Sequence, residues 1–465
     1  MLQKTLDSRV TPYLILNSEA TMLDNQISQK ITARSLIKFI SPTILMTVFM
    51  SLYTVVDGLF IARFVNSNAL AALNIVFPLI GFCFGIGIML GTGGSAMIGK
   101  LLGEGKRDEA NRNFTMIICY AVIIGVIFSI LAFIFLEPML YFLGSTNELY
   151  SNCKNYIVIL LPFFTLQIVQ VMLSILFVTA GKPTVGLVLT IASGVTNIVL
   201  DYIFLAILKT GIEGAAWATA IGFSITPIFA LFYFFSNNAS LRFIPFKFKL
   251  KPLIKSCSNG FSEMVNSLSG NIIIWLMNII IIKMAGEIGV AALSAVLYIQ
   301  YLFNAIFIGI ANGVSPVISY HYGAENQLQM RKTLQVTIWI TAISSIAMTI
   351  SSILLAKPLG LLFLGSDTIG VELTEQGALL YSASYLFVGF NIVASALFTA
   401  LSNGVVSAML SAVRTLVLTI VSIIVMSWLF QLSGLWLSVP AAEAVAVLIS
   451  LVTVKLYNKH YGYLK

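Results

Sequence analysis

Charged and metal-binding residues are scarce in this chain of 465 residues. Only 9% of the residues are charged and only two are histidines, whereas about a quarter of an ordinary soluble protein is charged. His321 and His460 lie in or beside predicted cytoplasmic segments, and no acidic residues cluster as a Mg²⁺ site or a protease dyad requires. A membrane-embedded enzyme, the alternative from another functional class, is therefore disfavoured, and we expect no cofactor.

Cysteine is scarce as well. The four cysteines are scattered over positions 83, 119, 153 and 257, which fits neither a disulfide framework nor the paired spacing of a zinc site. We therefore expect them to fill space in the protein interior.

Apolar residues are abundant. They make up 58% of the chain, and the mean hydropathy is +0.97. A membrane-spanning helix needs roughly 20 apolar residues, and long uniform runs favour helices over the alternating strands of a barrel. The sequence predicts an all-α membrane protein with twelve spans, near residues 36–62, 69–99, 113–136, 155–180, 184–208, 212–236, 257–285, 288–320, 333–356, 377–402, 405–430 and 434–457.

The distribution of the basic residues predicts the orientation. Of 26 lysines and arginines, five fall on one side of the twelve spans, namely Arg63, Lys154, Lys209, Lys283 and Lys357. The other 21 fall on the side of both termini, which the positive-inside rule assigns to the cytoplasm. The net charge of +8 thus indicates a multi-pass protein of the plasma (inner) membrane and not a nucleic-acid partner.

The predicted organisation is two halves joined by a basic linker. Segment 1–35 lacks the pattern of a secretory signal and is expected in the cytoplasm, as is the tail 458–465. A first lobe is predicted over 36–236 and a second over 256–457. The linker 237–255 contains "LRFIPFKFKLKPLIK", with five basic residues and no acid, and is expected to lie on anionic lipid headgroups.

The two halves are related by a repeat at an offset of 220 residues. "ALAALN" at 69–74 corresponds to "GVAALS" at 289–294, and Gly103 corresponds to Gly323. Six spans per half predict two parallel six-helix lobes about a pseudo-two-fold axis along the membrane normal. Such lobes suit alternating access, so a secondary transporter is favoured over a channel.

Acidic residues within the spans break this symmetry. Asp57, Asp201, Glu263 and Glu443 lie in predicted spans, where a charge costs roughly 2.5 to 3.5 kcal/mol and needs a partner, water or a proton. At the repeat offset, four polar residues of the first half correspond to apolar ones of the second: Asp57 to Met277, Asn197 to Val417, Asp201 to Val421, and Thr219 to Val439. This polar set therefore indicates a function added to the first half.

Helical depth predicts that these residues meet. At about 1.5 Å per residue, Asp57, Asp201 and Thr219 all fall in the outer half of the membrane. Asn197 precedes Asp201 by one turn, as Tyr53 precedes Asp57. Carboxylate, amide and hydroxyl oxygens suit a hard monovalent cation such as Na⁺. The pair could instead share a proton, or the residues could form only interhelical hydrogen bonds.

The polar residues of the second half have less specific interpretations. Glu263 could contact a drug, a basic residue or interfacial water, and Arg414 could extend toward the membrane surface. Glu443 could meet a cationic cargo or form an interhelical hydrogen bond. Pro42 is expected to kink the first span.

The segments "SPTILMTVFMSLYTVVDGLFIARFVNSNALAAL" at 41–73, "GEGKRDEANR" at 103–112 and "GIEGAAWATAIG" at 211–222 resemble the multidrug and toxic compound extrusion (MATE) family. The resemblance spans residues 36–457 and implies two six-helix lobes that export organic, often cationic or amphipathic solutes against inward Na⁺ or H⁺.

Several residues match the family's motifs. The first-helix proline and aspartate match Pro42 and Asp57, and the fifth- and sixth-helix residues match Asn197, Asp201 and Thr219. The resemblance thus implies a cation site in the first lobe. The seventh-helix acid resembles Glu263, whereas a tenth-helix acid is absent and leaves Asn391 and Ser395 as polar candidates.

Glu263, Asn391 and Glu443 are therefore the predicted residues of a substrate cleft. We expect a monomer surrounded by lipid. A flippase for lipid-linked oligosaccharides is the related alternative, although its pyrophosphate cargo would need basic residues in the cleft, and only Arg414 lies well within a span.

Overall fold

The described part of the chain is almost entirely helical. The computed structural model describes all residues except 1–26, 28–29, 66, 237–239, 366 and 464–465. Most of the expected cytoplasmic segment 1–35 and the last two residues of the tail thus lie outside the described residues. The first lobe contains α2 (Ala33–Phe64), α3 (Ser67–Gly103), α4 (Arg107–Ile134), α5 (Leu136–Phe142), α6 (Tyr150–Leu160), η1 (Leu161–Phe163), α7 (Phe164–Thr179), α8 (Pro183–Asp201), η2 (Tyr202–Ile207) and α9 (Ile212–Phe235).

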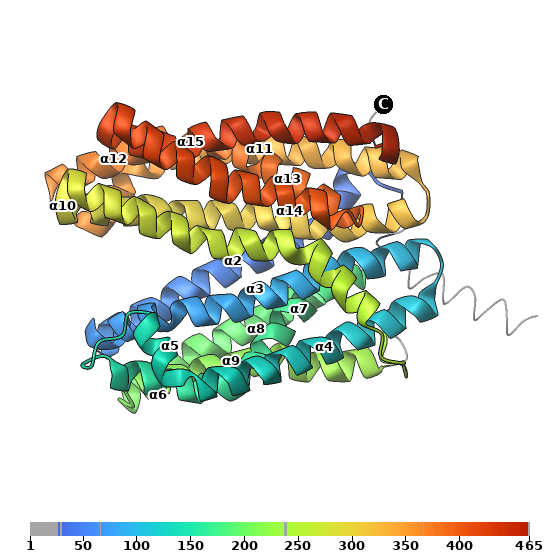
Figure 1. The fold of residues 1–465 in the computed structure, drawn as a ribbon, viewed down its shortest axis with the longest axis horizontal. Helices are drawn as coiled ribbons and strands as arrows, with labels where there is room; N and C mark the ends of the chain where they lie inside the picture. The colour runs from blue at the N-terminus through green and yellow to red at the C-terminus, as the bar shows by residue number, and fades with distance from the viewer. Residues whose placement is uncertain (1–26, 28–29, 66, 237–239, 366, 464–465) are drawn as a thin grey trace, which may run out of the picture.

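The second lobe begins within the basic linker, because α10 (Leu250–Gly323) takes up its last residues. It continues with α11 (Gln327–Leu364), α12 (Thr368–Ser382), α13 (Tyr385–Ala400), α14 (Gly404–Ala412), η3 (Val413–Leu418) and α15 (Thr419–Tyr461). One buried apolar cluster lies within the first lobe. A second cluster fills the second lobe and also includes Leu36, Phe39 and Ile40 of α2 and Val178 of α7. Figure 1 shows the two lobes as two layers, with α2 and α3 of the first lobe beside α10 of the second.

The described helices cross a membrane twelve times. Nine helical stretches are long and apolar enough to span it, and α12 and α13 form a further span bent by 47°. Two of the nine stretches each contain two crossings. The 74 residues of α10 would extend about 111 Å as one straight helix, but the chain reverses at Gly286, and the stretch Gly404–Tyr461 reverses at Gln431. Figure 1 shows both reversals at the left end of the molecule.

Both described chain ends lie at the same end of the molecule. The Ile31 amide donates a hydrogen bond to Gln329 Oε1 at 2.9 Å, and Arg331 Nε donates to the Gly462 carbonyl at 2.7 Å. Gln329 and Arg331 both belong to the first turns of α11. We call this end of the molecule, where α2 and α11 begin and α15 ends, the termini face.

The turns between helices repeat from lobe to lobe. Left-handed backbone conformations recur at offsets of 220 or 221 residues: Gly105 (φ 73°) and Glu325 (53°), Gly144 (101°) and Gly365 (61°), Gly181 (71°) and Ser402 (60°), Gly211 (69°) and Gln431 (52°). The predicted repeat is thus present in the backbone. α8 and α14 begin 221 residues apart, one more than the offset of 220 found in the sequence. Between these two helices, Asp201 therefore corresponds to Ser422 and not to Val421. The Asp201 carboxylate still has no acidic counterpart.

Glycines allow the lobes to touch near the termini face. A Cβ atom on Gly103 would lie 2.0 Å from the Tyr320 carbonyl oxygen, and one on Gly323 would lie 2.0 Å from that of Lys100. These two contacts are related by the repeat, because each residue pair is 220 apart. Backbone therefore meets backbone across the pseudo-two-fold axis, which only glycine permits.

The interface continues away from the termini face along α2 and α3. On α3, a Cβ on Gly93 would overlap the Ser256 carbonyl oxygen. On α2, Thr47 Oγ1 donates a hydrogen bond to the Ala305 carbonyl at 2.7 Å. The first two helices of the first lobe thus hold the second lobe through α10.

Candidate functional site

Asp57 and Asp201 meet between α2 and α8. The helices approach closely because Gly194 of α8 faces the rings of Phe49 and Tyr53 on α2, where a Cβ would lie 2.5 Å from Phe49 Cε1. Asp201 is the last residue of α8 and is fully buried. Its carboxyl group interacts directly with the Asp57 carboxyl group. The structure therefore places the two side chains in one site.

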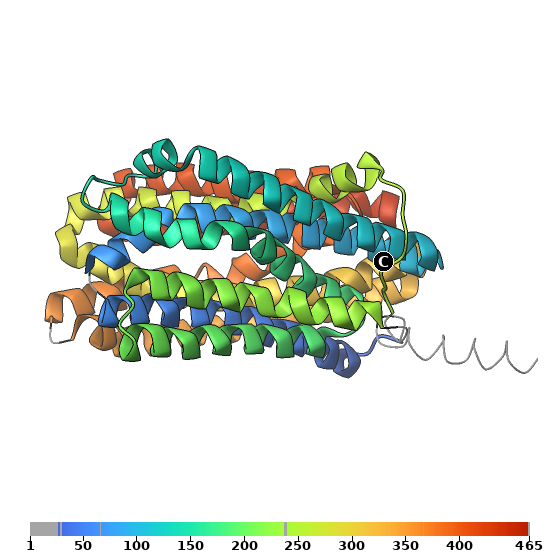
Figure 2. The ribbon, with the colours of Figure 1, turned by 90° about the horizontal axis from the view of Figure 1, so that it is seen from below.

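α9 and α6 add hydroxyl groups to this site. Asn197, one turn before Asp201, points its Nδ2 at Thr219 Oγ1 of α9 at 3.5 Å. The buried Tyr156 of α6 lies beside Thr219 and interacts electrostatically with both carboxyl groups. Figure 2 shows α8 and α9, in green, in front of the blue α2. We call Asp57, Asn197, Asp201, Thr219 and Tyr156 the acidic site.

Acceptor oxygens in the acidic site lack donors. Asp57 Oδ1, both carboxylate oxygens of Asp201 and Asn197 Oδ1 are buried without a hydrogen-bond partner in the described part of the chain. Neither carboxylate forms an ion pair with a described lysine or arginine. Two adjacent carboxylates cannot both remain charged in an apolar interior. The two carboxyl groups could share a proton, and the oxygen-only donor set could equally hold a monovalent cation such as Na⁺.

Two other predicted residues lie beside the acidic site or on the same helix. Tyr53 interacts electrostatically with Asp57 and with Tyr301 of the second lobe, so it lies where the two lobes meet. Pro42 lies inside α2, which continues through it as a helix. The kink expected at Pro42 stays a prediction.

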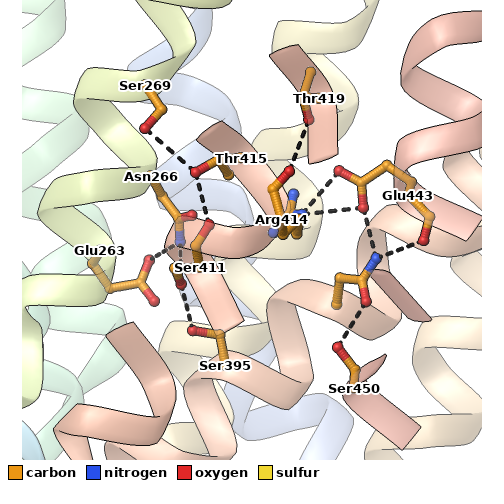
Figure 3. A network of polar contacts seen from close by, with 11 residues as sticks. Glu263, Asn266, Ser269, Ser395, Ser411, Arg414, Thr415, Thr419, Glu443 and Ser450 are labelled. Atoms are coloured by element: carbon orange, nitrogen blue, oxygen red, sulfur yellow. Dashed lines mark hydrogen bonds and ion pairs between the residues drawn. The ribbon is translucent and has the colours of Figure 1, made fainter. Parts of the chain in front are cut away.

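The second lobe contains an ion pair that the sequence analysis did not predict. Arg414 Nε lies 2.8 Å from Glu443 Oε1 and 3.1 Å from Oε2 (Figure 3). Both residues are buried, with 9% and 5% of their surface exposed. The expectation that Arg414 extends toward the membrane surface is therefore wrong, because Glu443 satisfies it within the helix bundle. Glu443 makes an interhelical contact instead of offering a free carboxylate.

Asn391 completes this ion pair. Its Nδ2 donates to Glu443 Oε2 at 2.7 Å and to the Glu443 carbonyl at 3.0 Å, while its Oδ1 accepts from Ser450 Oγ at 2.9 Å. The predicted cleft residues Asn391 and Glu443 thus lie side by side, but each binds the other. At offsets of 221 and 220, Arg414 and Glu443 correspond to Ser193 and Phe223, so the first lobe has no such pair.

Glu263 belongs to a separate chain of polar side chains. Asn266 Nδ2 lies 3.5 Å from Glu263 Oε2 and 3.3 Å from Ser411 Oγ, and Ser411 Oγ lies 2.8 Å from Ser395 Oγ. Figure 3 shows Glu263 on the opposite side of Arg414 from Glu443. Glu263 has no ion-pair partner among the described residues. Of the three predicted cleft residues, it alone offers a carboxylate that no described basic residue neutralises.

A comparison with protein families decides the family of this chain. The model of the MatE family matches residues 42–203 and 267–425, which cover most of both lobes. The chain belongs to the MatE family. The matched residues include Pro42, Asp57, Asn197 and Asp201 of the predicted site.

Related MatE proteins match over nearly their full lengths. The multidrug export protein MepA of Staphylococcus saprophyticus is 24% identical over 91% of this chain and 93% of its own length. MepA of Staphylococcus haemolyticus is 23% identical over 90% of this chain and 92% of its own length. The relatives are export proteins and not enzymes.

Solved structures share the fold. A multidrug resistance MATE family transporter in an outward-facing conformation has a TM-score of 0.88 and 20% identity, with 93% of this chain and 97% of that chain covered. A MATE transporter of Vibrio cholerae has a TM-score of 0.85 and 17% identity, with 95% of this chain and 98% of that chain covered. The protein is thus an all-α membrane protein with the two-lobed transporter fold.

Proposed function

We propose that this protein is a secondary active multidrug exporter of the plasma membrane, which exchanges organic, often cationic solutes for inward-moving Na⁺ or H⁺. The observation that carries the proposal is the pair of buried carboxyl groups in the acidic site, which no described basic residue neutralises. The export proteins among its relatives support the choice of cargo.

The acidic site couples ion flow to transport in this mechanism. A bound cation or proton removes the repulsion between Asp57 and Asp201 and allows α2 and α8 to pack closely. Its release restores the repulsion and favours a different arrangement of these helices. A monovalent cation that crosses 100 mV releases about 2.3 kcal/mol, which can sustain roughly a 50-fold gradient of an uncharged cargo. One-for-one exchange with a monovalent cationic cargo is electroneutral, so the concentration gradient of the ion drives it instead.

Alternating access proceeds by movement of the lobes about their glycine contacts. We propose that the termini face is cytoplasmic, as the positive-inside rule predicts. The contacts of Gly103 and Gly323 then keep the cytoplasmic side closed. They must separate when the cleft opens inward, so the lobes rock as two bodies.

The second lobe contributes Glu263 to cargo binding. A carboxylate without an ion-pair partner suits a cationic cargo, whereas Glu443 is already neutralised by Arg414. The same ion pair disfavours the flippase alternative, because the basic residue that a pyrophosphate would need is already engaged. A monomer is sufficient for this mechanism, since both lobes belong to one chain.

Transport in vesicles tests the proposal. Purified protein in liposomes loaded with a cationic dye is energised separately by Na⁺ and by pH gradients. We expect Asp57→Asn and Asp201→Asn each to abolish ion-driven dye efflux, and Asp108→Asn, an exposed residue of α4, to leave it unchanged. Full efflux by both site variants would refute coupling at the acidic site, and the gradient that drives wild-type efflux identifies the ion.

A further inference from the structure

An open cavity of about 470 Å³ lies outside the acidic site, between the start of α10 and the turn before α14. Both elements begin at the termini face. The lining residues are Lys251, Ile254, Lys255, Ser258, Asn259, Ser402, Asn403, Gly404 and Val405. None of these nine residues is acidic, and neither the ion-coupling mechanism nor cargo binding uses them.

Donors without partners line this cavity. Asn259 is 98% buried, with 2% of its surface exposed, and its Oδ1 accepts from the Gly404 amide at 3.1 Å. This bond fixes the orientation of the carboxamide and leaves Nδ2 without a partner among the described residues. Ser402 Oγ is also buried and has no partner there. Unpaired buried donors destabilise the folded protein, and an acceptor ligand would offset that cost.

Two positive charges and a helix N-terminus accompany these donors. Lys251 and Lys255 lie one turn apart on α10 and both line the cavity. α14 begins at Gly404, so its positive dipole end faces the same space. Glu104 and Glu109 of the first lobe act on Lys255, but neither lines the cavity. The set of donors matches a phosphate group.

The apolar rim indicates which phosphate compound fits. Ile254 and Val405 line the same cavity, and each exposes 65% of its surface. Exposed aliphatic side chains beside two lysines suit a molecule with a charged head and an apolar tail. The position at one end of the membrane spans places the cavity at the level of lipid headgroups.

We propose that this cavity binds the phosphate headgroup of an anionic phospholipid. The phosphate lies between the two lysines, Asn259 Nδ2 and Ser402 Oγ, while the acyl chains pass Ile254 and Val405. The lipid thereby joins the first helix of the second lobe to α14, beside the basic linker that precedes α10. A soluble phosphate shares the headgroup chemistry but makes no use of the apolar rim.

Lipid binding to the full-length protein tests the site. The protein is purified in detergent, and the binding of dioctanoyl phosphatidylglycerol and of inorganic phosphate is followed by thermal stabilisation and native mass spectrometry. Asn259→Asp keeps the acceptor for the Gly404 amide but removes the free donor and adds a repelling charge. Lys251→Gln/Lys255→Gln removes the two lining charges. Lys247→Gln/Lys249→Gln is the matched control, because both residues belong to the same linker but do not line the cavity.

We expect both site variants to weaken phosphatidylglycerol binding about tenfold or more, because each loses charge-assisted contacts, and the control to stay within about twofold. Equal losses in the site and control variants would show attraction by net charge alone and overturn the proposal. Unchanged binding in Asn259→Asp would also overturn it. Inorganic phosphate that stabilises the protein as well as the lipid does would assign the cavity to a soluble phosphate.

Discussion

Gly103 provides a quantitative test of the contact between the lobes. In Gly103→Ala the new Cβ would lie 2.0 Å from the Tyr320 carbonyl oxygen and 2.8 Å from the Ala324 nitrogen. These are backbone atoms of a packed helix, which cannot rotate away as a flexible side chain can. Overpacking of this kind costs about 1–3 kcal/mol. Replacing glycine by alanine also stabilises the helix by about 1 kcal/mol. This gain is the same whether the termini face is open or closed, so it does not change the equilibrium between the two states.

In the proposed mechanism the cost falls on one conformation only, because the two lobes are in contact at Gly103 only when the termini face is closed. An energy of about 1–3 kcal/mol shifts a two-state equilibrium about 5- to 150-fold. We therefore expect Gly103→Ala to increase the population of the state open at the termini face by this factor. The repeat-related Gly323→Ala is expected to act alike.

Distances between spin labels measure this shift. Cysteines replace Asp108 and Leu328, two exposed residues 220 apart in the first turns of α4 and α11, in a protein whose four natural cysteines are replaced by serine. Gly270→Ala is the control, since nothing lies within 4 Å of its added Cβ. An unchanged distance distribution in Gly103→Ala, or an equal change in Gly270→Ala, would refute the reasoning.

Two further predictions concern the polar groups of each lobe. Arg414→Met leaves Glu443 buried without its charge partner and is expected to lower the free energy of unfolding by about 3–5 kcal/mol. Arg414→Met/Glu443→Leu removes both charges and is expected to recover most of this lost stability. Denaturant titrations measure both variants, and a double variant that loses as much stability as the sum of the single variants would contradict this. Tyr156→Phe removes a hydroxyl that lies beside Thr219 and both carboxyl groups. We expect the ion concentration for half-maximal efflux to rise about fivefold with an unchanged maximal rate, which corresponds to the loss of one net hydrogen bond of about 1 kcal/mol. An unchanged half-saturation value would remove Tyr156 from the acidic site.

The first lobe was predictable from sequence because its polar residues obey simple rules. Depth along a helix follows from the rise per residue, and residues one turn apart share a face. These two rules predicted that Asp57, Asn197 and Asp201 lie together. Tyr156 escaped prediction because a single tyrosine near the end of an apolar span carries no pattern that distinguishes it from a residue at the membrane interface.

The ion pair of the second lobe was missed for a different reason. Taken by itself, Arg414 predicts a residue that extends to the membrane surface, and Glu443 predicts a cargo contact or an interhelical hydrogen bond. The depth of each residue follows from the rise of about 1.5 Å per residue, counted from the helix end at the termini face. Arg414 comes ten residues after Gly404, which places it about 15 Å deep, and Glu443 comes eighteen residues before Tyr461, which places it about 27 Å deep. This difference of about two helical turns in predicted depth gave no indication that the two side chains form an ion pair.

The repeated turns carry a consequence for the two lobes as folding units. Where the first lobe has Gly105, Gly181 and Gly211, the second holds the same left-handed geometry with glutamate, serine and glutamine. A side chain in that geometry costs about 1–2 kcal/mol, so three connections of the second lobe are held against their local preference by the helices they join. In the first lobe glycine occupies these three positions, although Lys209 (φ 51°), two residues before Gly211, also lies in this region. At these three turns the second lobe therefore reaches the same backbone geometry with side chains whose local preference opposes it.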